Sequence, residues 1–181
     1  MRKGPLVMRW MYDASTPPPN PPHWHVAAGY IGGDTPHVWT QAEWDAQWSP
    51  CRLPIFVHTG ADASADAEAD ARSIVSELQR LRVPRNCSVV VDTETGIYHT
   101  YLTVLSERLW AARYSLINYG SLSFVVQNAK THGGRWAADW TGVLEMAPGD
   151  DIVATQCISA AQLGRPYDMS VIDGNVPLWR K

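Results

Sequence analysis

The chain alternates short apolar runs rich in β-branched residues with longer segments whose apolar residues recur at helical spacing. This alternation is typical of β-α units built around a largely parallel sheet. It predicts eight strands, at residues 7–13, 26–31, 54–58, 88–92, 115–119, 135–138, 152–156 and 168–172.

Four helices are predicted between these strands. Thr40 and Glu43 have the spacing of a capping box, which marks the start of the first helix. The second helix follows Gly60 and ends before Pro84, and its core face is Ala71, Ile74, Val75, Leu78 and Leu81. The third presents Tyr98, Leu102, Leu105 and Leu109 on one face, and a shorter fourth covers residues 122–130.

The chain length limits how these units are arranged. Eight units in 181 residues leave roughly 23 residues each, whereas a full eight-fold barrel has about 250 residues, so some helices must be missing. Only eleven residues separate Gln156 from Asp168, and a parallel crossover needs about a dozen or more. The last strand should therefore run antiparallel. We predict one α/β domain over residues 1–181, a compressed TIM-type barrel with four to five helices.

Composition excludes several classes of function. The chain is 45% apolar and 18% charged with a net charge of −3, so it lacks the basic excess of nucleic-acid-binding proteins. Cys51, Cys87 and Cys157 are an odd set without metal-ligand spacing, which predicts free thiols and neither disulfide nor zinc. Phosphate-binding and dinucleotide-binding glycine motifs are also missing from the sequence, so we expect no cofactor.

The apolar pattern also bears on location. Arg9 and Asp13 interrupt the apolar stretch near the N-terminus, so we expect no signal peptide. No segment has the roughly 18 consecutive apolar residues of a membrane span, so no membrane association is expected. The chain has nine tryptophans and seven tyrosines but only two phenylalanines. Tryptophan and tyrosine rings carry a polar group and stack well on sugar faces.

Acidic residues gather at the predicted strand ends, where the functional groups of a parallel barrel collect. Asp13 ends the first strand, Asp139 follows the sixth, and Asp168 begins the antiparallel eighth at the same rim. Asp92 and Glu94 end the fourth strand, two residues apart. Residues two apart on a strand point the same way with Cα atoms about 7 Å apart, so both carboxylates are expected in one pocket.

The Asp92 and Glu94 pair suits glycosidic cleavage. Close carboxyl groups drive their proton affinities apart, so one stays ionised while the other holds a proton. That combination supplies an acid for the leaving oxygen and a carboxylate for the cationic sugar. Two alternatives remain open: an acidic turn without function, and a hard-cation site to which His58 and His99 could add nitrogen ligands.

Several short motifs, in order and approximate spacing, resemble the family 25 glycoside hydrolases, the lysozymes that cut bacterial cell walls. They are YDAS at 12–15, DTE at 92–94, WAADW at 136–140, ATQ at 154–156 and YDMSVID at 167–173. The stretches GYIGG at 29–33, VWTQAE at 38–43 and LPIF at 53–56 look more like the related actinobacterial and phage glycoside hydrolase-like domains. The resemblance covers nearly the whole chain.

The resemblance implies an eight-stranded barrel with about five helices and an antiparallel last strand. It implies that Glu94 is the general acid, that Asp92 stabilises the cationic intermediate, and that Asp13 and Asp168 are supporting acids. The implied reaction is hydrolysis of the β-1,4 bond after N-acetylmuramic acid, with retention. On this basis the partner is bacterial cell-wall glycan, reached from a phage virion or after release from the host cytoplasm, and virion proteins are further possible partners.

Substrate contacts are expected from side chains near the strand ends. Aromatic rings beside carboxylates offer stacking faces and indole donors to a sugar. The candidates are Trp39, Trp136, Trp140, Tyr119, Gln156 and Asp139. The competing hypothesis is a catalytically silent barrel that serves as a carbohydrate-binding or virion structural module.

Overall fold

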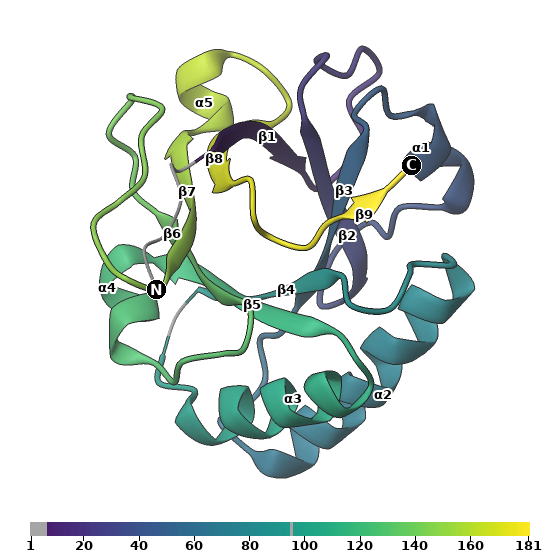
Figure 1. Ribbon diagram of the computed structural model, residues 1–181, viewed down its shortest axis with the longest axis vertical. Coiled ribbons are helices and arrows are strands. Elements are labelled where there is room, and N and C mark those ends of the chain that lie inside the picture. Colours follow the sequence, from purple (N-terminus) through teal and green to yellow (C-terminus); the bar gives the residue numbers. More distant parts are fainter. Residues whose placement is uncertain (1–6, 95) are drawn as a thin grey trace.

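The computed structural model describes residues 7–94 and 96–181, and within them the strands form a closed barrel (Figure 1). The strands are β1 (Met8–Ala14), β2 (Val26–Gly33), β3 (Cys51–Val57), β4 (Ser88–Glu94), β5 (Ser115–Ser121), β6 (Gly134–Ala138), β7 (Ile152–Ile158), β8 (Asp168–Asp173) and β9 (Trp179–Arg180). The sheet order is β2-β1-β8-β7-β6-β5-β4-β3-β9, and β2 also pairs with β3, which closes the ring.

Strands β1 to β7 run parallel to one another around the barrel, and β8 runs antiparallel to both β7 and β1. All eight strands predicted from the apolar pattern are present, and the antiparallel direction of the last is confirmed. Asp13 and Asp168 are direct register partners in the β1–β8 pair. The short β7–β8 connection therefore places Asp168 at the rim where the parallel strands end.

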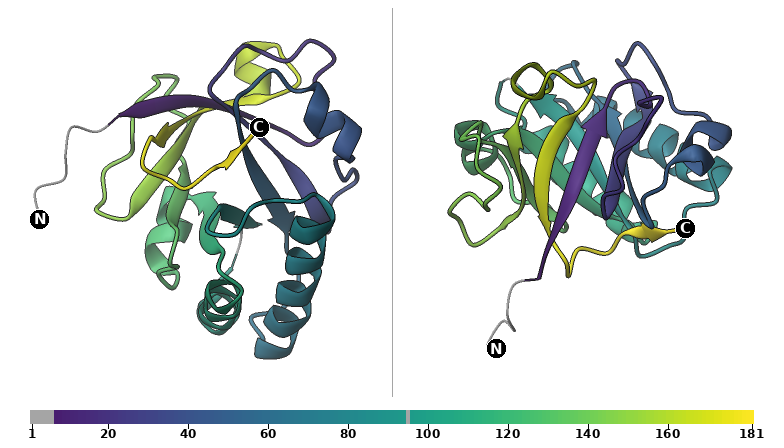
Figure 2. Two further views of the ribbon diagram at one scale, coloured as in Figure 1. Left: turned by 45° about the vertical axis from the view of Figure 1, so that its right-hand side comes forward. Right: turned by 90° about the horizontal axis from the view of Figure 1, so that it is seen from above.

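The five described helices are α1 (Gln41–Ala46), α2 (Ser64–Arg80), α3 (His99–Ala111), α4 (Leu122–Gln127) and α5 (Ala160–Leu163). Helices α2 and α3 lie side by side outside the barrel, as the views in Figures 1 and 2 agree. The capping box of Thr40 and Glu43 at the start of α1 is present as predicted. Among the described residues no helix is long and apolar enough to cross a membrane.

Two helices differ from the sequence prediction. Helix α4 ends at Gln127, three residues early, because Asn128 adopts an extended conformation and its side chain bonds backbone atoms. Its amide oxygen accepts from the Tyr98 N–H at 2.6 Å, and its amide nitrogen donates to the Phe124 carbonyl at 3.1 Å. The pattern did not predict α5, a single turn that Ser159 caps and Gly164 ends with a φ of 61°.

The apolar residues form two layers. One lies inside the barrel and includes Met11, Leu53, Val90, Ile117 and Trp136. The other lies between the barrel and the helices, and it contains the predicted core faces of α2 and α3. Each strand contributes side chains to both layers, because successive side chains point to opposite faces.

Strand β9 was not predicted, and it pairs antiparallel with the first two residues of β3. Strand β3 begins at Cys51, three residues before the predicted start at 54, because residues 51–53 also pair with β2. The residues that lead into β9 include Val176 and Leu178, which belong to the cluster inside the barrel. They close the end of the barrel opposite the acidic rim. The three cysteines are free and buried, as expected.

Candidate active site

Four carboxylates from three strands meet at the rim of the barrel. Asp13 comes from β1, Asp92 and Glu94 from the end of β4, and Asp168 from the start of β8. They surround a cavity of about 60 Å³, whose wall is Asp13, Tyr30, Ile55, Asp92, Glu94, Tyr119, Trp136, Gln156 and Asp168. The barrel topology thus brings together the four acids expected to be catalytic, whereas Asp139 does not line this cavity.

Asp92 and Glu94 share this cavity, although the strand between them is irregular. The β4–β5 register shifts between Asp92 and Glu94, and Glu94 adopts a positive φ of 35°. A non-glycine residue with positive φ is uncommon and often marks a functional position. Asp92 is buried inside the barrel mouth whereas Glu94 is exposed to solvent, so the two carboxylates face different environments.

Burial raises the proton affinity of this group of acids. Removal from water, followed by the charge of Glu94, raises the pKa of Asp92 to about 7. Burial also raises the pKa of Asp13 well above its usual value, with further contributions from the charges of Asp168 and Asp92. The pKa of Asp168 is raised as well, again mainly by burial. The cluster therefore retains protons close to neutral pH.

Gln156 connects the acids across the barrel interior. Its amide nitrogen donates to Asp13 Oδ2 at 2.9 Å and to Asp168 Oδ2 at 3.0 Å. Its amide oxygen accepts from the Tyr119 hydroxyl, and Asp168 Oδ1 accepts from the Ala160 N–H at the start of α5. These contacts hold β1, β5, β7 and β8 in one hydrogen-bonded network and fix the direction of each acid.

Unsatisfied polar atoms remain in the same place. Asp13 Oδ1, Asp92 Oδ1 and the indole nitrogen of Trp136 are buried without a hydrogen-bond partner among the described residues. Buried polar groups nearly always have partners, so each exception needs an explanation. A ligand with both donors and acceptors would satisfy these atoms.

The three tryptophans expected to contact substrate lie in different places: one at the site, one in the core and one at the surface. Trp136 lines the 60 Å³ cavity but is only 1% exposed, so its indole edge faces that cavity and no stacking face is free. Trp39 is 0% exposed, lies against Trp44 in the outer core and donates its indole N–H to the Ser15 carbonyl. The expectation that Trp39 contacts substrate is therefore wrong, since a ring sealed against its neighbours cannot stack on a sugar.

Trp140 and Asp139 follow β6 outside both rim cavities. Trp140 is 45% exposed, and the Asp139 N–H donates to the Gln156 carbonyl at 3.0 Å. Neither side chain belongs to the residues that line the carboxylate cluster.

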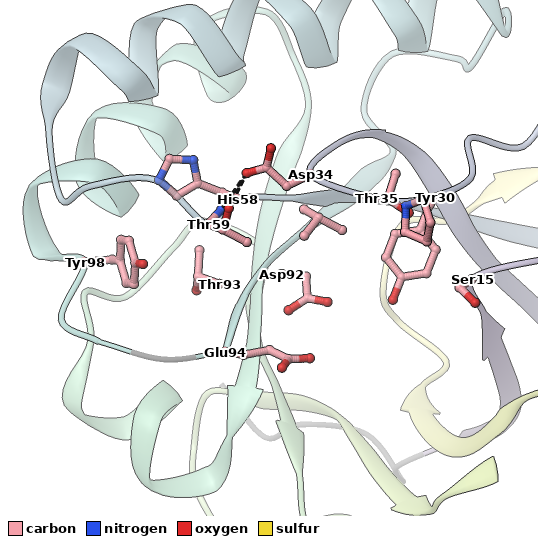
Figure 3. A pocket seen from close by; sticks show the side chains of 12 residues that line it. Ser15, Tyr30, Asp34, Thr35, His58, Thr59, Asp92, Thr93, Glu94 and Tyr98 are labelled. Atoms are coloured by element: carbon pink, nitrogen blue, oxygen red, sulfur yellow. Dashed lines mark hydrogen bonds between the residues drawn. The ribbon is translucent and has the colours of Figure 1, made fainter.

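A larger cavity of about 300 Å³ adjoins the small one and shares Tyr30, Asp92 and Glu94 with it. It extends over the ends of β2, β3 and β4 (Figure 3). The remaining wall consists of Ser15, Asp34, Thr35, Pro36, Val57, His58, Thr59, Thr93 and Tyr98. Asp34 Oδ2 accepts from the Thr59 N–H at 3.1 Å and from the Thr59 hydroxyl.

Sequence reasoning missed the partners of His58. Its Nδ1 lies 2.8 Å from Asp70 Oδ2 in α2, which also accepts from the Tyr101 hydroxyl of α3 at 2.8 Å. The His58 ring stacks on Tyr101 with centroids 3.8 Å apart. Burial alone would lower the pKa of His58, but the hydrogen bond and charge of Asp70 outweigh it and raise that pKa above its usual value.

The hard-cation alternative receives no support from this arrangement. His58 is committed to Asp70, and His99 is exposed at the start of α3. Within residues 7–94 and 96–181 no three His, Cys, Asp or Glu side chains are grouped so that they could hold a metal ion.

Solved structures with the same fold are known, although no family model and no curated protein matches the sequence. An uncharacterized protein of B. stearothermophilus superposes with a TM-score of 0.73 at 15% identity, over 92% of this chain and 97% of that chain. The catalytic domain of endolysin ply40 from bacteriophage P40 of Listeria monocytogenes gives 0.66 at 14% identity, over 95% and 96%. The modular Cpl-1 endolysin, complexed with a peptidoglycan analogue, gives 0.64 at 16% identity, over 92% and 55%.

These likenesses show the fold. It is the fold seen in the endolysin ply40 catalytic domain, the autolysin LytC, the spore cortex lytic enzyme SleM and the Cpl-1 endolysin. At identities this low the likeness carries no assignment of activity.

Proposed function

We propose that this protein is a peptidoglycan hydrolase of the N-acetylmuramidase type, formed by one barrel domain over residues 1–181. It would cleave the β-1,4 bond after N-acetylmuramic acid with retention, and its partner would be bacterial cell-wall glycan. We also propose that it reaches the wall from a phage virion or after release from the host cytoplasm. The fold shared with endolysin and autolysin catalytic domains supports a cell-wall glycosidase.

The observation that carries the proposal is the pairing of a buried with an exposed carboxylate at one cavity wall. Asp92 has a pKa of about 7, raised by burial and by the charge of Glu94. Asp92 therefore holds its proton up to about pH 7. Glycosidic cleavage needs one transferable proton and one carboxylate charge at such a pair.

In the proposed mechanism the proton of Asp92 passes to Glu94 when the glycan binds, and Glu94 gives it to the glycosidic oxygen as the bond to the sugar breaks. Asp92 offers negative charge to the oxocarbenium-like centre that forms. Asp13 and Asp168, held by Gln156, lie beside this centre as supporting acids. Water then completes hydrolysis, and its proton returns to Glu94.

The test is release of reducing ends from purified peptidoglycan across pH 4 to 8. We expect the wild-type protein to release them, and Glu94→Gln to lower the rate by about a hundredfold or more, because it removes the transferable proton but keeps the shape. Asp92→Asn should have a similar effect. Glu107→Gln on the exposed side of α3 is the matched control and should leave the rate unchanged.

The opposite outcome would favour the competing hypothesis. A wild-type protein that binds cell walls but releases no reducing ends at any of these pH values, with or without divalent ions, is a silent carbohydrate-binding or virion structural module. Equal rates for wild type and Glu94→Gln would reject the proposed role of Glu94.

A further inference from the structure

We propose that the 300 Å³ cavity over the ends of β2, β3 and β4 binds a protonated primary amine carried by the substrate. The inference rests on the proposed function only in taking the ligand to be a fragment of cell-wall material. It adds a specificity for positive charge that hydrolysis of the β-1,4 bond does not itself require.

The charge of the cavity wall is the first argument. Among the described residues that line it, Asp34, Asp92 and Glu94 are carboxylates, and His58 is the basic side chain. His58 is already engaged by Asp70 at 2.8 Å and by the Ala61 carbonyl at 3.4 Å. The wall therefore holds three carboxyl groups against one basic side chain, whose Nδ1 is turned toward Asp70.

Asp34 supplies a negative charge. Hydrogen bonds from the Thr59 hydroxyl and the Thr59 N–H lower the pKa of Asp34 below its usual value, so it is ionised in weakly acidic and neutral solution. Both bonds use Oδ2, which leaves Oδ1 as an acceptor. In Figure 3 Asp34 and Glu94 stand on opposite sides of the space into which Asp92 projects.

Unpartnered atoms in the same wall are the second, independent argument. Thr93 is 4% exposed and Asp92 is 7% exposed, yet Thr93 Oγ1 and Asp92 Oδ1 have no hydrogen-bond partner among the described residues. Both residues line the cavity. An ammonium group has three donors and no acceptor, so it satisfies hydroxyl and carboxylate oxygens together.

The lining chemistry favours an organic cation over a metal ion. No three His, Cys, Asp or Glu side chains within residues 7–94 and 96–181 are grouped to hold a metal. The rings of Tyr30 and Tyr98 form part of the wall, and aromatic faces attract ammonium groups. An ammonium also needs only hydrogen-bond acceptors, without a fixed coordination geometry.

Two parts of cell-wall material carry such an amine: an amino sugar that has lost its acetyl group, and the diamino acid of the peptide stem. The test measures binding of two ligand pairs at pH 6 by calorimetry. The first pair is the β-1,4 glucosamine dimer and its N,N′-diacetyl form. The second is a muramyl tripeptide ending in lysine and the same compound acetylated on the lysine side chain.

We expect one pair to show at least about tenfold tighter binding of the free amine, and the pair that does so identifies the source. Asp34→Asn should reduce this preference to about threefold or less, because it removes the negative charge of the Asp34 carboxylate. Thr93→Val, a second variant of similar shape, should also weaken the preference. Glu107→Gln, which removes the same charge from the exposed side of α3, should leave it unchanged.

Equal affinity for free and acetylated forms in both pairs would overturn the inference, as would a preference that survives in Asp34→Asn. The failure of the proposed function is distinct from this result. A protein that prefers amines through Asp34 but releases no reducing ends retains the amine site without hydrolysis. A protein that hydrolyses peptidoglycan without amine preference retains the function without the site.

Discussion

Asp92 is the residue in which burial and charge oppose each other most directly. It is 7% exposed and one of its oxygens has no partner among the described residues. Its neighbours are also acidic: Glu94 follows it, and Asp13 from β1 interacts with it. A site built in this way gives up stability for chemistry, as functional sites often do.

The raised pKa of Asp92 makes a prediction about stability. A carboxyl whose folded pKa is about 7, against about 3.9 when unfolded, favours the folded state below pH 4, and this contribution is lost as the pH rises to 7. Asp92→Asn removes the ionisation and should raise the free energy of unfolding at pH 8, by at most about 4 kcal/mol.

The measurement is the melting temperature of wild type and Asp92→Asn at pH 4.5 and pH 8. The melting temperature of the variant should exceed that of wild type by a large amount at pH 8 and by a small amount at pH 4.5. An equal difference in melting temperature between variant and wild type at the two pH values would show that Asp92 ionises in the folded protein as it does in the unfolded chain.

At the scale of elements, the carboxylate of Asp70 links the end of β3 to helices α2 and α3 through hydrogen bonds. Asp70 of α2 accepts from His58, which follows β3, and from Tyr101 of α3. The same segment forms part of the 300 Å³ cavity through His58 and Thr59. Packing of α2 against α3 and the shape of that cavity are therefore coupled.

Asp70→Asn should destabilise the protein most at acid pH. The folded pKa of His58 is raised above its usual value, so its extra stability is present below pH 6.5 and is lost as the pH rises through the folded pKa. We expect a loss of about 2 kcal/mol at pH 5.5 and a smaller loss at pH 9, measured by urea unfolding.

Glu77→Gln on the same helix is the control. Glu77 pairs with Arg80 at the surface, and exposed ion pairs contribute little. A loss for Asp70→Asn that does not change with pH would mean that His58 carries no proton in its pairing with Asp70.

At the scale of the whole molecule, the two ends of the barrel differ in chemistry: one is acidic and the other is closed by apolar side chains. The rim where the parallel strands end carries the acids, and the segment before β9 closes the other end with Val176 and Leu178. Trp179 of β9 packs against Trp44 with centroids 5.4 Å apart. It also covers Arg52, whose guanidinium lies 4.5 Å from the ring.

Trp179→Ala should cost about 3–5 kcal/mol, the usual loss for a large buried ring. The variant would also lose the cation–π contact with the buried Arg52 guanidinium and the packing against Trp44. Trp110→Ala is the control, since Trp110 is exposed. Urea unfolding of both variants checks the difference, and equal losses would show that β9 does not seal the barrel.

The sequence by itself determined eight of the nine described strands and the rim that carries the acids. Apolar alternation is a local property, and parallel strands end at one rim whatever their packing, so Asp13, Asp92 and Asp168 could be placed together from the sequence. The antiparallel β8 followed from the length of one connection.

Only the tertiary structure decided which side chains face the site and how they ionise. Trp39 and Trp136 both stand beside strand ends in the sequence, but packing against Trp44 seals one while the barrel interior turns the other toward the acids. The partners of His58, the pairing of β9 with β3 and the raised pKa of Asp92 depend on residues distant in the chain. Burial and contact are properties of the closed barrel, and no local pattern encodes them.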